Sequence, residues 1–270
     1  MLRPFARLLP LLALVACAGS DPEGAPPPRT REGSAVPRAA REPGPRVLFL
    51  LTSHGELGST GKPTGAWLGE VTHAHEVFAR AGARIEYASP RGGEVPLDGV
   101  DRRDPINAAF LDDPARAALL ERTTPAREVE AEEYDAIYLP GGHGTMFDLR
   151  GNDDVARLVA GVYDKGGVVG AVCHGPAGLL DVELRNGLRI LEGRKVTGFT
   201  NAEEAAVKLA GVMPFLLEDA LQEQGATFVG APAWQENVIV DGRLVTGQNP
   251  ASAAGVARAM LKLLSPRESK

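Results

Sequence analysis

The sequence predicts an α/β fold in which a largely parallel sheet carries helices on both faces, and three observations lead to this prediction. Short apolar, β-branched runs alternate along the chain with segments whose apolar residues recur at helical spacing. Two of the runs, 46–52 and 167–173, are apolar almost throughout, which is typical of parallel strands buried on both faces. Two late runs are joined by Asp241-Gly242, which favours a small antiparallel hairpin.

The elements are expected in a regular alternation along the chain. The first helix, over 67–82, has apolar residues at the spacing of Trp67, Val71, Ala74 and Phe78 and ends at a glycine. Further helices are expected over 153–165, from about 201, and over 251–264. Strands are expected over 46–52, 83–89, 135–142, 167–173, 195–200, 226–230, 236–240 and 243–247.

Two segments are expected to precede one folded domain over 46–266. Residues 1–17 have a positive start and an apolar core too short to span a bilayer, and they end in a sequence that resembles a bacterial lipobox, with Cys17 as the lipidated residue. A plain secretory signal is the alternative. Residues 18–45 are rich in Pro, Gly and Arg, so we expect a disordered tether. The sequence therefore predicts a lipid-anchored protein of the bacterial cell envelope, on its periplasmic or outer-surface side, that contacts the membrane through this lipid only.

The composition limits the classes of partner. Of the 270 residues, 44% are hydrophobic and 24% are charged, as is usual for a globular protein. The net charge of -6, the low aromatic content of 5% and the lack of a basic stripe argue against a nucleic-acid partner. With a lipid on Cys17, Cys173 would be the remaining thiol, and no disulfide could form within the chain.

Cys173 stands where an apolar run ends abruptly and His174, Gly175 and Pro176 open a predicted helix. A strand that turns sharply into a helix strains the backbone of the turn residue and presents its side chain to a cleft. The N–H groups of the helix would lower the pKa of the thiol and stabilise negative charge. The pattern indicates a cysteine nucleophile, and a buried structural cysteine is the alternative.

Three segments follow predicted strands, and ligands of open α/β sheets bind at the carboxyl ends of strands. These segments are the long glycine-rich loop after the first strand, residues 140–149, and the cysteine itself. We expect them to converge in one cleft. The N–H groups of Gly141, Gly142 and His174 could form an oxyanion hole, and His143 is grouped with these glycines as a substrate-binding residue. A tight turn without a ligand is the alternative.

Acidic residues near this cleft could take part in proton transfer. Glu70 lies one turn into the first helix and can point back toward Cys173. If protonated it would donate to the sulfur, if ionised it could act as a general base, and otherwise it only complements the helix dipole. His174 needs an orienting acid, for which Glu203 and Glu204 are the candidates; a solvated helix face is the alternative for both.

His73, His75 and Glu76 suggest a metal site, but their spacing argues against it. His73 and Glu76 share a helix face that His75 does not, and helical zinc pairs prefer a four-residue spacing. The sequence therefore predicts no metal.

These segments together resemble the PfpI superfamily, which includes protein deglycases, PfpI-type proteases and heat-shock glyoxalases. The resemblance covers about residues 46–264 and rests on five pieces in the same order: TGAWLGE, which contains Glu70, then PGGHGTMFDL, AVCHGP, KVTGFTNAEE and DGRLVTGQNP. It implies a flavodoxin-like sandwich that is often a homodimer and has no organic cofactor.

The glyoxalase III-like branch of this superfamily has a similar acid after the first loop and another after the KVTGF strand. By that resemblance Cys173 is the nucleophile, His174 its proton-transfer partner and Glu70 the carboxylate that contacts the thiol. Glu204 is the third member of the triad, with Glu203 as the alternative. The implied activity is the glutathione-independent conversion of methylglyoxal or a related dicarbonyl to a 2-hydroxy acid.

Other functions are compatible with the same residues. Class I glutamine amidotransferase domains resemble the chain more distantly, and they need a histidine downstream of the cysteine, whereas none follows His174. A cysteine amidase, peptidase or protein deglycase would use the same triad. A non-enzymatic stress holdase or redox sensor is the third alternative, since a low-pKa thiol is prone to oxidation.

Overall fold

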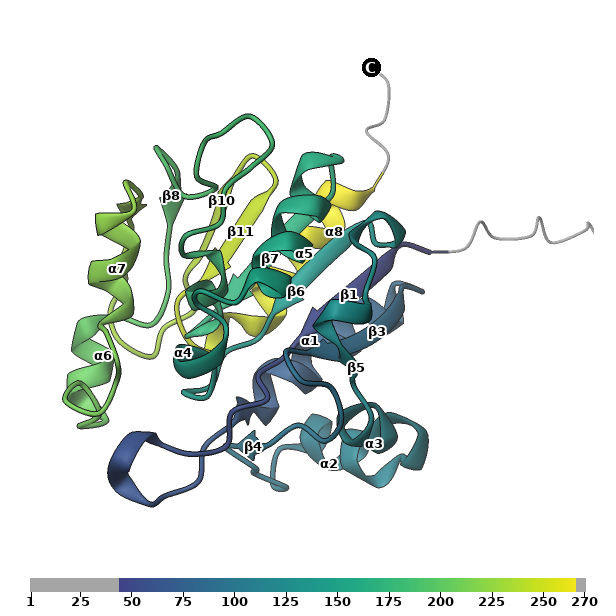
Figure 1. Cartoon of the computed structure of the whole chain (residues 1–270). Helices are drawn as coiled ribbons and strands as arrows, with labels where there is room; N and C mark the ends of the chain where they lie inside the picture. Colours follow the sequence, from purple (N-terminus) through teal and green to yellow (C-terminus); the bar gives the residue numbers. More distant parts are fainter. Residues whose placement is uncertain (1–43, 266–270) are drawn as a thin grey trace, which may run out of the picture. The chain divides into compact units, whose positions relative to one another are not determined.

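A seven-stranded sheet forms the centre of the computed structural model, which describes residues 44–265 (Figure 1). The strand order is β10-β11-β7-β6-β1-β3-β5, and every neighbouring pair is parallel except the β10–β11 hairpin. Two short parallel pairs, β2 with β4 and β8 with β9, lie outside this sheet. The strands are β1 (Arg46–Leu50), β2 (Ala66–Trp67), β3 (Arg84–Ser89), β4 (Leu97–Asp98), β5 (Thr124–Pro125), β6 (Ala136–Leu139), β7 (Val168–Val172), β8 (Lys195–Val196), β9 (Thr227–Phe228), β10 (Val238–Asp241) and β11 (Leu244–Gly247).

Helices cover both faces of the sheet, which confirms the expected flavodoxin-like α/β sandwich. α1 (Leu68–Arg80) and α8 (Ala253–Leu264) pack against each other on one face, and α5 (Asp153–Asp164) packs against β6 and β7. Figure 1 shows α5 in front of the sheet and α8 behind it. The shorter helices are α2 (Pro105–Asp112), α3 (Pro114–Glu121), α4 (Thr145–Asp148), α6 (Asn201–Ala206) and α7 (Leu217–Glu223).

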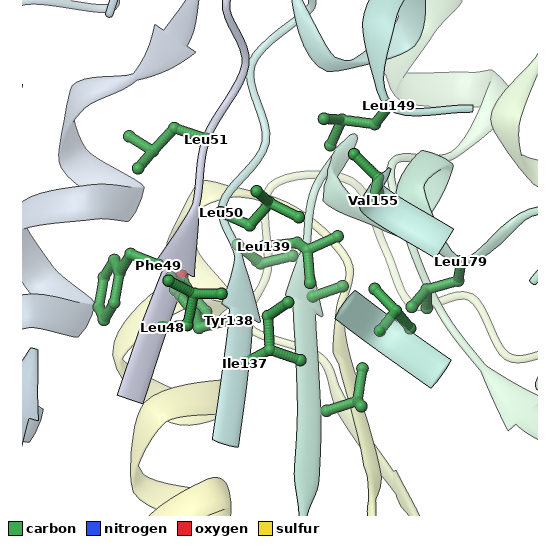
Figure 2. Packing of buried hydrophobic residues seen from close by; sticks show 14 of the residues in the cluster. Leu48, Phe49, Leu50, Leu51, Ile137, Tyr138, Leu139, Leu149, Val155 and Leu179 are labelled. Atoms are coloured by element: carbon green, nitrogen blue, oxygen red, sulfur yellow. The ribbon is translucent and has the colours of Figure 1, made fainter. Parts of the chain in front are cut away.

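The middle strands are apolar because both of their faces are covered. In the register of β1 and β6, Leu48 lies beside Ile137 and Phe49 beside Tyr138, and all four side chains are buried (Figure 2). Burying one such side chain contributes about 1.5–3 kcal/mol. This packed centre fixes the carboxyl ends of β1, β6 and β7, from which the segments that carry the candidate site residues emerge.

Most predicted elements correspond to observed ones, although the short helices α4 and α7 were not predicted, and two further regions differ. The strand expected over 195–200 is wrong beyond Val196, because the chain leaves the β8–β9 pair there and turns toward α6. No element was predicted for 90–134, which contains α2 and α3. Each of these helices begins with a capping aspartate followed by proline, at Asp104 and Asp113, and this start signal is visible in the sequence.

The segments predicted to precede the domain fall outside the part of the chain that the structure describes. This applies to the leader over 1–17 with Cys17 and to nearly all of the tether over 18–45, so their boundaries remain predictions. Among residues 44–265, no helix is both long enough and apolar enough to cross a lipid bilayer.

Candidate active site

The chain turns sharply at Cys173, directly after β7, with a backbone φ of 59°. This left-handed conformation is uncommon for a residue with a side chain and is held only where the surroundings impose it. Here the N–H of Cys173 donates to the carbonyl of Gly247, and its carbonyl accepts from the N–H of Phe199, both at 2.9 Å. The chain continues as a short 3-10 helix, Gly175–Leu179, in place of the expected α-helix.

The sulfur of Cys173 is less exposed and less acidic than the sequence predicts. The residue is 4% exposed. Burial raises the pKa of the Cys173 thiol well above its usual range, and the charge of Glu70 adds to this shift, while the N–H groups of Gly142 and His174 act to lower it. The expectation of a low pKa is therefore wrong for the resting site, because desolvation outweighs the few N–H groups of a 3-10 turn.

His174 connects the sulfur to a carboxylate. Its Nδ1 lies 3.3 Å from Sγ of Cys173, and its Nε2 lies 2.7 Å from Oε2 of Glu204. Burial lowers the pKa of His174 to about 4, although the bond to Glu204 acts to raise it. Against the effect of burial, hydrogen bonds from the two neighbouring imidazoles lower the pKa of Glu204 to about 2. At neutral pH an ionised Glu204 accepts from Nε2–H, so Nδ1 of the neutral ring is free to accept the thiol proton.

His143 makes a second contact to the same acid. Its Nε2 lies 3.0 Å from Oε1 of Glu204, and its ring centroid is 4.2 Å from that of His174. The two oxygens of Glu204 thus each accept from one imidazole. The sequence grouped His143 with the oxyanion-binding glycines, whereas the structure places its ring against Glu204.

Glu70 is fully buried beside the Cys173 thiol. Its Oε2 accepts from the N–H of Gly141 at 2.6 Å, while Oε1 has no conventional hydrogen-bond partner among the described residues. Burial raises the pKa of Glu70 to about 8, although the bonds from Gly141 and Cys173 act to lower it. At neutral pH the carboxyl of Glu70 therefore keeps its proton and can donate a hydrogen bond to the sulfur. In this protonated state Glu70 places no negative charge beside the thiol.

The glycines after β6 allow the close approach of the backbone to Cys173. A Cβ on Gly141 would lie 2.6 Å from the N of His174 and 2.9 Å from the Cβ of Cys173. Gly142 has a φ of 97°, which favours glycine, and a Cβ there would lie 2.2 Å from the carbonyl oxygen of Gly65. The N–H groups of Gly142 and His174 point to the sulfur, where a developing oxyanion would also lie.

Glu203 and Glu204 are both buried, so neither belongs to a solvated helix face. Only Glu204 contacts the imidazoles. Glu203 caps α6 through Thr200 and accepts from the backbone N–H of Trp234 at 2.8 Å and from Asn249 at 2.9 Å. The two oxygens of Glu203 accept hydrogen bonds from the loops that surround the site, and Glu204 is the residue that contacts His174.

A pocket of about 280 Å³ opens above Cys173. Apart from the cysteine, the imidazoles and Asn249, its walls are mainly apolar, and they include Trp67, Phe199 and Trp234. The helical spacing predicts Trp67 on the buried face of the first helix, and no sequence pattern indicated Phe199 or Trp234 as pocket residues. The one available signal was position, since Phe199 lies in the KVTGF segment next to the candidate acids.

Comparison with known proteins agrees with this architecture. Residues 65–263 match the sequence profile of the DJ-1/PfpI family. The chain belongs to the DJ-1/PfpI family. It is 34% identical over 230 residues to "Glyoxalase 3" of Candida albicans, which covers 78% of this chain and 95% of that protein. It is 33% identical over 228 residues to "Glutathione-independent glyoxalase HSP31" of Saccharomyces cerevisiae, covering 78% of this chain and 94% of that protein.

Solved structures also superpose on most of the chain. The Rapid Encystment Protein 24 kDa of Francisella tularensis has a TM-score of 0.80 at 41% identity, covering 82% of this chain and 100% of that one. The crystal structure of glyoxalase III from Candida albicans has a TM-score of 0.77 at 32% identity, covering 82% of this chain and 97% of that one. The match to the PfpI superfamily and its glyoxalase III branch is therefore confirmed.

The comparisons contradict the predicted localisation of this DJ-1/PfpI protein. The curated relatives that it matches over nearly their whole length are fungal glyoxalases, a result that does not fit a lipid-anchored protein of the bacterial cell envelope. The prediction depended on a short apolar stretch that ends at Cys17. Such a stretch occurs by chance more readily than the matched motifs of the folded domain do, and nothing in the comparisons supports the lipoprotein signal.

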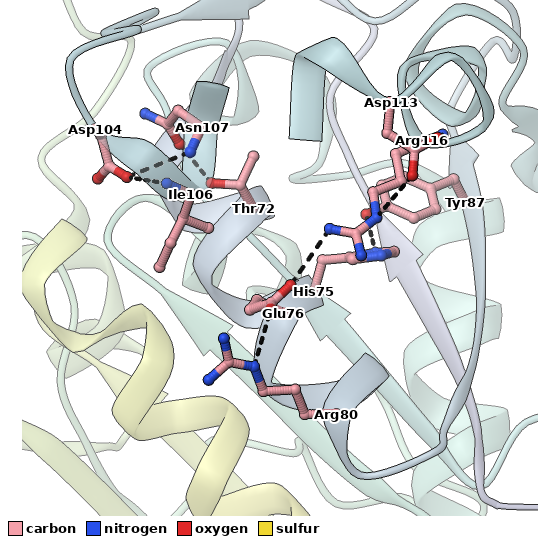
Figure 3. Close-up of polar contacts among 10 residues, drawn as sticks. All are labelled: Thr72, His75, Glu76, Arg80, Tyr87, Asp104, Ile106, Asn107, Asp113 and Arg116. Carbon is pink, nitrogen blue, oxygen red and sulfur yellow. Dashed lines mark hydrogen bonds and ion pairs between the residues drawn. The ribbon is translucent and has the colours of Figure 1, made fainter. Parts of the chain in front are cut away.

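The helical histidines of this DJ-1/PfpI domain have partners other than a metal. Figure 3 shows His75 beside Tyr87, with Nδ1 3.0 Å from the hydroxyl, and Glu76 between Arg80 and Arg116. His73 pairs with Asp104 at 2.7 Å. In the described part of the chain, the group whose donor atoms lie close enough to hold a cation is His143, His174 and Glu204, within 4.8 Å of one another. Hydrogen bonds between these same atoms already occupy that group.

Proposed function

We propose that this protein is a glutathione-independent glyoxalase that converts methylglyoxal or a related 2-oxoaldehyde to the 2-hydroxy acid through Cys173. The observation that carries the proposal is the chain of contacts from Sγ of Cys173 to Nδ1 of His174 and from Nε2 to Glu204, at the floor of a small pocket. The names of the fungal relatives support the same reaction.

The first step would be addition of the thiol to the aldehyde. Nδ1 of His174 takes the proton from Cys173 as the sulfur bonds to the aldehyde carbon, and the carbonyl electrons move to its oxygen. The N–H groups of Gly142 and His174 lie where they can stabilise that oxygen until it takes the proton from the imidazolium. The product is a hemithioacetal, in which Cys173 plays the part that a glutathione thiol would otherwise play.

The second step would move one hydrogen between the two carbons. A base removes the proton from the carbon bonded to sulfur, and the electrons form an enediol with the neighbouring ketone. A proton then returns to the second carbon, which leaves a 2-hydroxyacyl thioester. Glu70 and His174 are the two groups beside the sulfur that can exchange protons, and each such group contributes about 10²–10⁴-fold to a rate.

The last step would be hydrolysis. Water adds to the thioester, the carbon–sulfur bond breaks, and the sulfur recovers its proton as the 2-hydroxy acid leaves. The sum is one 2-oxoaldehyde plus one water to one 2-hydroxy acid, and the oxidation of one carbon balances the reduction of its neighbour. No external electron donor or acceptor enters this balance.

The test is lactate formation by the purified full-length chain from methylglyoxal without glutathione. Cys173→Ala should abolish it while circular dichroism stays unchanged, and Cys17→Ala, which removes the other cysteine of the chain, should leave it unchanged. Retained turnover in Cys173→Ala would rule the mechanism out. Release of amines from amide substrates with no lactate would favour the amidase alternative instead. We also propose the homodimer implied by the family, which light scattering of the same sample tests.

A further inference from the structure

The mouth of the pocket exposes apolar side chains that a folded protein usually covers. Of the large hydrophobic residues exposed in 44–265, Val207 and Trp234 border this pocket, and Trp234 is 48% exposed. Trp67 and Phe199 continue the apolar wall toward Cys173. An apolar pocket wall with exposed apolar side chains at its edge indicates a surface that an apolar ligand group covers.

Trp234 is held in this position against its backbone preference. Its φ is 65°, a conformation that an aromatic residue rarely adopts without support from its surroundings. The backbone N–H donates to the buried carboxylate of Glu203 at 2.8 Å. The indole meets Phe199 edge-on, with ring centroids 5.8 Å apart, and Phe199 in turn lies 4.4 Å from the ring of His174. A residue with a strained backbone and an exposed ring that connects to His174 through Phe199 is better explained by ligand contact than by packing.

The pocket is also larger than methylglyoxal requires. Its 280 Å³ equals the share of about nine water molecules in the liquid. The polar groups lie at the floor around Cys173 and His174, where the two carbonyls would react. The remaining volume, in a wall that includes Trp234 and Trp67, would face only the single methyl group of methylglyoxal.

We propose that Trp234, together with Trp67, binds the substituent of the 2-oxoaldehyde, and that the enzyme prefers a large apolar substituent, best an aromatic ring, over a methyl group. Aromatic rings gain from edge-to-face and offset contacts with an indole in addition to the area that they bury. The inference rests on the proposed function, because it assigns the substrate class of the same site. Trp234 is in this view a specificity-determining residue with no part in proton transfer.

The test compares phenylglyoxal with methylglyoxal in the wild type and in Trp234→Gly. Glycine suits a φ of 65° and keeps the N–H bond to Glu203, so this variant removes the ring without adding strain. The wild type should show a kcat/KM at least tenfold higher for phenylglyoxal. Trp234→Gly should reduce this preference to less than threefold, mainly through a higher KM for phenylglyoxal. Trp234→Phe should restore most of the preference, and Leu188→Ala, a change at an exposed apolar residue that does not line the pocket, should have no effect.

Equal kcat/KM values for the two substrates, or the same preference in Trp234→Gly as in the wild type, would overturn the inference. Absence of turnover on both substrates would overturn the proposed function only. The binding affinities of two unreacted diones would then test the inference. Calorimetry with 1-phenyl-1,2-propanedione and butane-2,3-dione compares a phenyl with a methyl group on an otherwise identical dione. Tighter binding of the phenyl compound by about tenfold, lost in Trp234→Gly, would support the inference, and equal binding would refute it.

Discussion

Replacing Glu204 with glutamine should strongly reduce the kcat for lactate formation, while the protein stays folded. The two carboxylate oxygens accept from Nε2 of His143 at 3.0 Å and from Nε2 of His174 at 2.7 Å. A glutamine has one oxygen and one NH2 group, so one of the two imidazoles must accept a hydrogen bond instead of donating one. Where that ring is His174, its proton moves to Nδ1, which faces Cys173 and can then no longer take the thiol proton.

The size of the loss depends on which imidazole changes. A His174 that keeps its tautomer still loses a hydrogen bond to a charged acceptor, which is worth about 1.5–3 kcal/mol and reduces kcat by roughly 10–150-fold. A His174 in the wrong tautomer should reduce kcat by about 10⁴-fold, as when an amide replaces the acid of a serine-protease triad. We therefore expect a decrease between about 10- and 10⁴-fold in Glu204→Gln.

The neighbouring residue offers a matched control. In Glu203→Gln, the amide oxygen can keep the bonds to Trp234 and Asn249, but the NH2 group then faces two donors. The N–H of Thr200 loses its acceptor, and the side-chain NH2 of Gln248 loses this bond but keeps a backbone carbonyl. An unpaired buried donor costs about 1–3 kcal/mol. For a domain of this size we expect the melting temperature to fall by about 2–12 °C. The kcat of the folded fraction should stay within about threefold of the wild type.

The assay measures initial lactate formation from methylglyoxal at 20–25 °C together with thermal melts followed by circular dichroism. The expected pattern is a folded Glu204→Gln with kcat lowered at least about tenfold and a less stable Glu203→Gln with kcat close to the wild type. A Glu204→Gln variant that keeps more than a third of the wild-type kcat would refute the triad. A Glu203→Gln variant that is as inactive as its neighbour while still folded would assign the acid to Glu203.

The pKa of Glu70 is raised to about 8, so the folded carboxyl keeps a proton that the unfolded chain releases near pH 4.5. The free energy of unfolding of the wild type should therefore fall between about pH 5 and 8, by roughly 4–5 kcal/mol in total. Glu70→Gln cannot titrate, and the difference between its melting temperature and that of the wild type should grow over this window; a difference independent of pH would refute the assignment. The value of kcat/KM should decrease below about pH 4, where His174 takes a proton, and above about pH 8, where an ionised Glu70 lies beside the thiol. A value of kcat/KM that still rises at pH 9 would contradict this account. Gly141→Ala should lower both the melting temperature and lactate formation, because its Cβ would lie 2.8 Å from the carbonyl oxygen of Val172, whereas Gly211→Ala, which meets nothing within 4 Å, is the control.

Periodic and local signals predicted most of the framework. The apolar runs of β1 and β7 and the spacing in α1, α5 and α8 are strong because those elements bury a whole face or both faces. The segment 90–134 was missed because its helices are short and its strands contain two residues each, so no periodic pattern can build up. In that segment, only the aspartate–proline starts of the helices were informative.

The residues of the candidate site could be predicted one by one, but their protonation states and mutual contacts could not. Cys173, His174, Glu70 and Glu204 were all named from motifs, and the structure brings them together from separate elements. The local pattern predicted an acidic thiol, whereas burial raises the pKa of Cys173. No local pattern indicated Trp234, because its position depends on a loop that Glu203 holds.

By itself, the order of residues determined the longer strands, the main helices, the sharp turn at Cys173 and the family, because these follow from patterns within a few residues of one another. Only the tertiary structure decided that Glu204 and not Glu203 meets His174, that Glu70 holds its proton beside the sulfur, and that tryptophan rings line the entrance. The physical reason is that protonation and contact depend on burial and on groups distant in sequence. Gly141 and Glu70, for example, are 71 residues apart and yet joined by a hydrogen bond of 2.6 Å.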